Sequence, residues 1–215
     1  MNKKKPLGMR IGESVFCAGY LIFAFIAAFL FAKGGNTFKQ LCAIMTLLLA
    51  AGDSFHLIPR ILVNIRGDRE KDRELLGLGN FISSITMTLF YVLLLSVMET
   101  YHPSIEVPSF YRIALVLLTG VRIVLCLYPM RQWFDRDRYP GKHILRNIPF
   151  VAMGILTVMY LISCFQETFL AVLVIVSFVC YMGTVLFAHE KPMMGMLMIP
   201  KTICYIWMIA ILLGR

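Results

Sequence analysis

One stretch of the chain decides the fold class: LLLAAGDSFHLIPR, residues 47–60, sets three ionisable side chains inside a long apolar run. Asp53, His56 and Arg60 are spaced three and four residues apart, so a helix places all three on one face. Ionisable side chains at membrane depth are costly and usually functional, and lipid offers them no partner. The stretch therefore predicts a helix whose charged face points into the protein and lines a candidate site.

The composition predicts a membrane protein with a single domain. Hydrophobic residues make up 59% of the 215 residues and charged residues only 15%, and a soluble domain of this size could not bury so much apolar surface. The chain has room for about seven apolar spans of ~20 residues with short loops. We therefore predict an all-α integral membrane protein, a bundle of seven transmembrane helices. The predicted spans are 11–32, 38–60, 77–98, 109–129, 147–165, 168–188 and 194–213.

The net charge of +9 is explained by where the basic residues lie. They concentrate before the first span, between the second and third, between the fourth and fifth, and after the sixth. The positive-inside rule then places the N-terminus in the cytoplasm and the C-terminus outside. The basic residues mark topology in a bacterial cytoplasmic membrane, and no nucleic-acid partner is expected. They are Lys3, Lys4, Lys5, Arg10, Arg66, Arg69, Lys71, Arg73, Arg131, Arg136, Arg138, Lys142, Arg146 and Lys191.

The polar residues inside the spans are predicted to lie at one depth. At ~1.5 Å per residue, Asp53 lies about 22 Å and Arg122 about 20 Å below the outer surface, whereas Lys201 lies about 10 Å from the inner one. All three therefore fall in the cytoplasmic half of the bundle, and the outer half offers little beyond hydroxyls. The residues expected to converge there are Asp53, His56, Arg60, Asn80, Ser84, Arg122, Glu190 and Lys201.

A purely structural role is the alternative for these charges. Asp53 with Arg122, and Glu190 with Lys201, could form ion pairs that only fix helix packing. The six cysteines are scattered singly through apolar spans with no Cys-x-x-Cys pair. Neither a disulfide framework nor a metal site is therefore predicted, and no cofactor is expected.

Short motifs in three spans carry a resemblance to a known family. They are Gly52-Asp53 with Leu57 and Pro59, then Gly79-x-Phe81-x-x-Ser84, then Gly183-x-x-Leu186-Phe187, with Tyr205 in the last span. Together they resemble the core of the YhhN-type lysoplasmalogenase family of small multi-span membrane proteins. The resemblance covers residues 38–98 and 180–213.

The chain also departs from the family pattern. Glu190-Lys191 stands where the family has a Ser-Asp pair, and Ile85 stands where a histidine follows the serine of the third span. The charged loop 61–76 is longer than the usual link, and the chain has one span fewer.

The resemblance implies hydrolysis of a lysolipid vinyl-ether or ester bond. Such a reaction needs a general acid and a general base in different environments. Asp53 takes the acid or base role, and His56 or Glu190 is the complementary group. Cationic side chains hold the lipid phosphate, because arginine can bind it bidentately. The substrate-binding residues implied are Arg60, Asn80, Ser84, Arg122, Lys201 and Tyr205, and the partner is a membrane lipid or lysolipid.

Two other functions fit the same residues. A small transporter or channel could use Asp53 and His56 as a proton relay, although the outer half is poor in polar residues and no inverted repeat is found. A non-catalytic lipid-binding protein is favoured by the absence of the Ser-Asp pair. These alternatives stay open from the sequence.

Overall fold

The computed structural model describes residues 7–66, 70–128, 133, 140–187 and 192–215. Within these ranges the chain is helical and contains no strand. Seven helices are long and apolar enough to cross a membrane, in agreement with the predicted number. They are α1 (Leu7–Ala32), α2 (Thr37–Arg66), α3 (Glu70–Tyr101), α4 (Ser109–Leu127), α5 (Pro140–Ser163), α6 (Thr168–Phe187) and α7 (Met198–Leu213), with a 3₁₀ helix, η3 (Pro192–Leu197), before α7.

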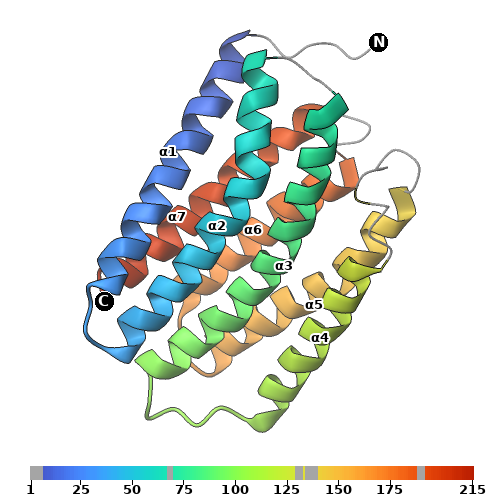
Figure 1. The fold of residues 1–215 in the computed structure, drawn as a ribbon. Coiled ribbons are helices and arrows are strands. Elements are labelled where there is room, and N and C mark those ends of the chain that lie inside the picture. Colours follow the sequence, from blue (N-terminus) through green and yellow to red (C-terminus); the bar gives the residue numbers. More distant parts are fainter. Residues whose placement is uncertain (1–6, 67–69, 129–132, 134–139, 188–191) are drawn as a thin grey trace.

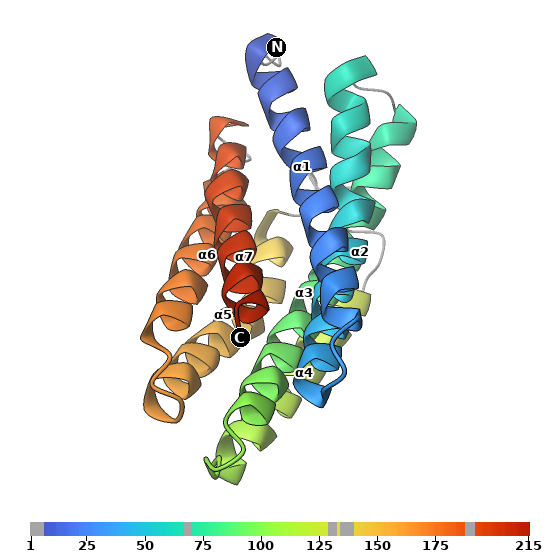
Figure 2. The ribbon, with the colours of Figure 1, turned by 90° about the vertical axis from the view of Figure 1, so that its left-hand side faces the viewer.

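The helices form a closed bundle. Each helix packs on the next one along the chain, and α7 returns to α1, which closes the ring (Figure 1). In the rotated view, α6 and α7 lie on one side of the bundle and α1 and α2 on the other (Figure 2). The side chains of α3 reach inward from this ring and contact α5, α6 and α7, so α3 supplies much of the core.

Aromatic side chains fill the core around the middle of α3. The ring of Tyr91 packs against Phe150 of α5 at 5.6 Å and Phe178 of α6 at 5.0 Å between centroids. Its hydroxyl lies 3.1 Å from the Tyr205 hydroxyl and 3.2 Å from the Ser177 hydroxyl, so these buried groups satisfy one another. This part of the bundle is therefore closely packed, and its hydrogen bonds link α3 to both α6 and α7.

Two glycines let α2 and α3 approach closely. A Cβ atom at Gly79 would collide with the backbone carbonyl of Phe55, and one at Gly52 would collide with the side chain of Thr86. Small residues at such contacts allow helix backbones to come together in membrane proteins. This close contact sets the face of α2 that carries Asp53 against α3.

The helix ends differ from the predicted spans in a systematic way. The predictions of 38–60 and 77–98 are shorter than α2 and α3, because hydropathy reports only the apolar part of a helix. Arginine, lysine and glutamate favour helix, so both helices continue into the charged segment between them. The last predicted span, 194–213, begins as the 3₁₀ helix η3 and becomes α-helical at Met198. Pro200 lies in the first turn of α7, where no intrahelical bond needs its missing N–H.

An ionic cluster ties three segments together at one end of the bundle. Glu167, between α5 and α6, accepts a 2.6 Å hydrogen bond from Arg215 and lies 3.2 Å from His102, which follows α3. Burial alone would raise the pKa of Glu167, but the hydrogen bonds and charges of Arg215 and His102 outweigh it. The pKa of Glu167 therefore lies below its ordinary value.

Candidate functional site

A polar cavity of about 270 Å³ lies among α2, α3, α4, α5, α6 and the η3–α7 segment. Seven of the nine residues predicted for the site line it, although they come from four different helices. They are Asp53, His56, Arg60, Asn80, Ser84, Arg122 and Lys201. The structure therefore brings these seven side chains to one cavity.

Asp53 is held in the cavity wall by two hydroxyl groups. The Tyr20 hydroxyl of α1 donates a 2.7 Å hydrogen bond to Oδ2, and the Ser83 hydroxyl of α3 donates one of 3.1 Å to Oδ1. Asp53 is 9% exposed, so its contact with solvent is restricted to the cavity. Because each carboxylate oxygen has its own donor, the side chain is fixed between α1 and α3 in one orientation.

Arg122 of α4 is almost fully buried, with 1% of its surface exposed. Its Nε donates to the Thr88 hydroxyl at 2.9 Å, and its Nη1 donates to the backbone oxygen of Arg146 at 2.7 Å and to Oδ1 of Asn147 at 3.2 Å. Its guanidinium carbon lies 4.0 Å from the centroid of the Phe150 ring. All of these partners are neutral groups, and no carboxylate of the described residues lies within 4 Å of it. Asp53 and Arg122 therefore do not form the ion pair that the purely structural alternative allowed.

Lys201 is the second buried cation of the cavity. It is 8% exposed, and its Nζ lies 5.2 Å from the ring centroids of both Tyr181 and Tyr205. In the part of the chain that the structure describes, the ammonium has neither a hydrogen-bond partner nor an ion pair. A buried ammonium is costly unless a charge of opposite sign lies near it, and Asp53, which lines the same cavity, supplies such a charge.

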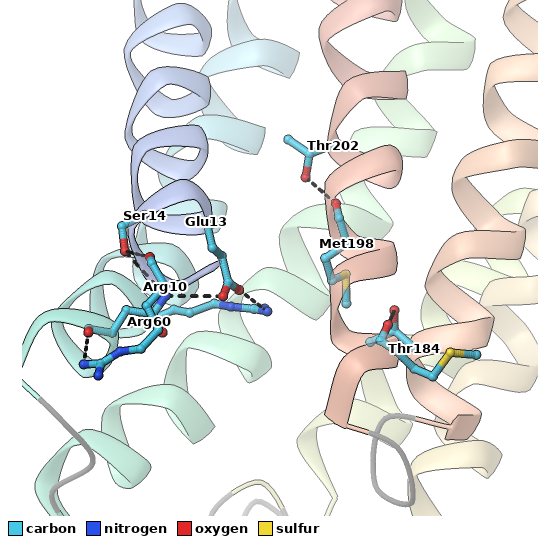
Figure 3. Close-up of polar contacts among 9 residues, drawn as sticks. Arg10, Glu13, Ser14, Arg60, Thr184, Met198 and Thr202 are labelled. Carbon is cyan, nitrogen blue, oxygen red and sulfur yellow. Dashed lines mark hydrogen bonds and ion pairs between the residues drawn. The ribbon is translucent and has the colours of Figure 1, made fainter. Parts of the chain in front are cut away.

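Arg60 stands at the edge of the cavity and has a different environment. It forms an ion pair with Glu13 of α1, which joins α1 to α2 (Figure 3). Nearby, the Arg10 side chain donates to the backbone oxygen of Asn64, a second tie between the same helices. A Cβ at Gly195 would lie 3.7 Å from Nη2 of Arg60, so the 3₁₀ helix η3 faces this arginine across the cavity.

On the cavity wall formed by α6 and α7, the threonine hydroxyls already bond to backbone oxygens. Thr202 donates to the oxygen of Met198 at 2.9 Å (Figure 3). The Thr184 hydroxyl of α6 lies 3.0 Å from the oxygen of Cys180 and 3.3 Å from that of Met194. The contact between Thr184 and Met194 joins η3 to α6, whereas the other two lie within single helices. They leave the charged side chains as the groups best placed to bind a ligand.

The cavity is electropositive. Among its described lining residues, four cationic side chains face one carboxylate. Charges interact more strongly in such a low-dielectric setting than in water. An anionic group of a ligand, such as a phosphate or carboxylate, would therefore be strongly favoured there. The four cations are Arg60, Arg122, Arg146 and Lys201.

Two predicted site residues are not part of the cavity wall. Tyr205 is 2% exposed and lies behind the wall, where its hydroxyl contacts Tyr91 and its ring faces Lys201. Glu190, predicted as a second carboxylate, lies outside the described residues. Ser84 lines the cavity, but its hydroxyl donates to the backbone oxygen of Asn80 at 2.8 Å.

The structure adds residues that the sequence analysis did not select. Ser83, not Ser84, binds Asp53; both lie on the helix face of Asn80, so the sequence spacing does not distinguish them. Arg146 and Asn147 line the cavity at the start of the fifth span, whereas Arg146 was interpreted only as a topology signal. Its guanidinium lies 4.5 Å from the ring centroid of Trp133.

The side chains of the described residues do not form a metal site. No group of three or more histidine, cysteine, aspartate or glutamate residues lies close enough there to hold an ion. The chemistry that this cavity can support is thus that of one positioned carboxylate, one imidazole and several fixed cations. No protein-family model, curated protein or solved structure matches this chain.

Proposed function

We propose that the protein is an intramembrane hydrolase that cleaves the vinyl-ether or ester bond of a lysophospholipid. The observation that carries this proposal is the placement of Asp53, held by Tyr20 and Ser83, in the same cavity as the buried cations Arg122 and Lys201. One part of the cavity thus offers an acid–base group, and another offers positive charge for a phosphate. The motifs around Gly52-Asp53 and Gly79, which resemble YhhN-type lysoplasmalogenases, support the same activity.

The proposed reaction adds one water molecule across the bond. For a vinyl ether, a general acid protonates the double-bond carbon that is not attached to oxygen, and water then adds to the oxocarbenium carbon as a base removes its proton. The hemiacetal collapses to a fatty aldehyde and the free glycerol hydroxyl. Asp53 and His56 both line the cavity and would divide the acid and base roles between them. Arg122, Arg146 and Lys201 would hold the phosphate while the chain lies along apolar helix faces.

The membrane setting is part of the proposal. Large apolar side chains cover the outward surface of the helices; among them Val15, Phe29, Val116 and Val179 are each more than half exposed. Such a surface needs lipid around it. We propose that the N-terminus lies in the cytoplasm and the C-terminus outside, in a bacterial cytoplasmic membrane. In this orientation the cavity faces the inner leaflet.

A second candidate function is binding of a lipid without turnover. It is favoured by the single carboxylate, Asp53, among the described residues that line the cavity. Hydrolysis of a vinyl ether usually relies on two acid–base groups, so His56 would have to replace the missing carboxylate. A transport function gains less support, because the packed rings of Phe90, Tyr91 and Tyr205 fill the core beside the cavity.

The test is turnover by the purified protein in detergent. Wild-type protein is expected to release aldehyde from lysoplasmalogen or fatty acid from lysophospholipid. Asp53→Asn should lower the rate by about 10²–10⁴-fold, a typical loss for general acid–base catalysis, under conditions where its unfolding midpoint shows that the variant is still folded. Glu106→Gln, the same acid-to-amide change in an exposed loop, is the control and should retain full activity. A folded wild-type protein that cleaves no lysolipid would disprove the hydrolase.

A further inference from the structure

We propose that the cavity selects a phosphate monoester, a phosphate group with no attached ammonium, over the zwitterionic choline and ethanolamine headgroups. The inference rests on the proposed function, since it names the headgroup of the proposed lysolipid substrate. The evidence is the set of contacts that the cations, aromatic rings and carboxylates in and near the cavity already make with one another.

The positive charges set the preference for an anion. Arg122 and Lys201 are 1% and 8% exposed, and neither has a carboxylate partner within 4 Å among the described residues. Arg146, which is also buried, lines the same cavity. A phosphate monoester carries up to two negative charges and three acceptor oxygens, and it can bridge several such donors. A zwitterionic headgroup would bring its own cation into this positive environment.

The aromatic rings of the cavity do not provide a cage for an ammonium group. Quaternary ammonium ligands are commonly held against the faces of aromatic rings. The three aromatic lining residues that the structure describes, Trp133, Phe150 and Tyr181, each face a cation of the protein itself. Arg146 lies 4.5 Å from the Trp133 centroid, Arg122 lies 4.0 Å from that of Phe150, and Lys201 Nζ lies 5.2 Å from that of Tyr181. A second cation at these rings would be repelled.

The carboxylates in and near the cavity also have partners within the protein already. Both oxygens of Asp53 accept hydrogen bonds, from Tyr20 and from Ser83. Glu13 is paired with Arg60. An ammonium group of a ligand would therefore have to compete with contacts that hold α1, α2 and α3 together, whereas a phosphate meets Arg122 and Lys201, neither of which has a carboxylate within 4 Å among the described residues.

The experiment measures binding separately from hydrolysis. The probes are saturated 1-O-alkyl lysophosphatidate, lysophosphocholine and lysophosphoethanolamine of one chain length, whose alkyl ether bond the proposed reaction does not cleave. Glycerol 3-phosphate serves as a phosphate monoester without a chain. Binding to the purified full-length protein in a nonionic detergent is read from tryptophan fluorescence, because Trp133 lines the cavity. The expected result is a Kd for lysophosphatidate at least about tenfold lower than for either zwitterionic lipid.

Variants connect this preference to the cavity. Lys201→Met should abolish most of the preference, because it removes a buried charge and keeps much of the side-chain volume. Lys39→Met is the matched control, since Lys39 contacts the Leu213 backbone oxygen away from the cavity, and it should retain the preference. If Lys201→Met does not fold, Arg146→Met takes its place. The headgroup comparison on the wild-type protein does not depend on either variant.

The outcomes separate this inference from the proposed function. Equal or tighter binding of the choline lipid overturns the inference even if the protein hydrolyses lysolipids. A preference for lysophosphatidate supports it even if no hydrolysis is found. If glycerol 3-phosphate binds as tightly as lysophosphatidate, the ligand of the cavity is a soluble phosphate ester. That result supports the phosphate-monoester site and contradicts the lipid hydrolase.

Discussion

The hydroxyl of Tyr20 on α1 donates a 2.7 Å hydrogen bond to Oδ2 of Asp53 on α2, and both side chains are buried. Tyr20→Phe removes this donor and leaves the ring packing unchanged. Removing one partner of a buried hydrogen bond costs about 1–3 kcal/mol, so the unfolding midpoint in detergent should fall. Turnover of the proposed lysolipid substrate should fall too, because Asp53 is then held only by Ser83.

A matched tyrosine provides the control for this prediction. The hydroxyl of Tyr160 donates to Glu99, which is also a tyrosine–carboxylate contact but involves none of the residues that line the cavity. Tyr160→Phe should lower stability by a similar amount and leave turnover unchanged. An equal loss of turnover in both variants would mean that activity follows stability and that Tyr20 does not position Asp53.

The contact between α2 and α3 depends on the missing side chain of Gly79. In Gly79→Ala the added methyl group meets the backbone carbonyl of Phe55, which cannot move without shifting α2. Overpacking of this kind costs about 1–3 kcal/mol, so the unfolding midpoint should fall clearly. Gly120→Ala on α4 is the control, because a Cβ there meets nothing within 4 Å and alanine favours helix. Equal midpoints for the two variants would contradict the close contact.

The fold class and much of the site could be predicted because both follow from strong physical constraints. Apolar runs of membrane-spanning length define the seven helices, and the high cost of charge at that depth draws Asp53, Arg122 and Lys201 to one cavity. Depth along a helix follows from a fixed rise per residue, so residues on different helices could be compared without knowing how the helices pack.

The rest of the site depends on helix rotation and packing. Ser83 and Ser84 differ by one position, and only the rotation of α3 decides that Ser83 binds Asp53 while Ser84 binds its own helix backbone. Arg146 lies at the start of a span. The sequence around such a basic residue is the same whether its side chain faces water or a cavity, so the sequence alone does not distinguish the two. Tyr205 lies one helical turn from Lys201 along α7, at a depth close to that of the cavity. Its ring, however, packs behind the cavity wall against Phe90.

The proposed orientation predicts which loops face the cytoplasm. Reporter fusions between α2 and α3 should report a cytoplasmic location, because the charged segment there contains Arg66, Arg69, Lys71 and Arg73. Fusions in the loop between α3 and α4, and after Arg215, should report the outside. A cytoplasmic signal from both the C-terminal fusion and the fusion between α2 and α3 would contradict the seven-span topology, since five spans, an odd number, separate these two sites.

The ionic cluster of Glu167, Arg215 and His102 predicts an acid-sensitive contribution to stability. The pKa of Glu167 is lower in the folded protein than its ordinary value, so the ionised form is favoured by folding. Such a group stabilises the fold at pH above the ordinary carboxyl pKa of about 4.3, and this contribution is lost as the pH falls through the lower folded-state pKa.

Glu167→Gln tests this contribution. The variant should lose roughly 1–2 kcal/mol of stability at neutral pH, because its neutral amide oxygen accepts a weaker hydrogen bond from Arg215 and forms no ion pair with it. It should also lose less stability than the wild type as the pH falls below about 4, since it has no carboxylate to protonate there. Unfolding midpoints of both proteins in detergent across pH 3–8 provide the measurement. Parallel pH profiles for the two proteins would show that the cluster does not contribute in this way.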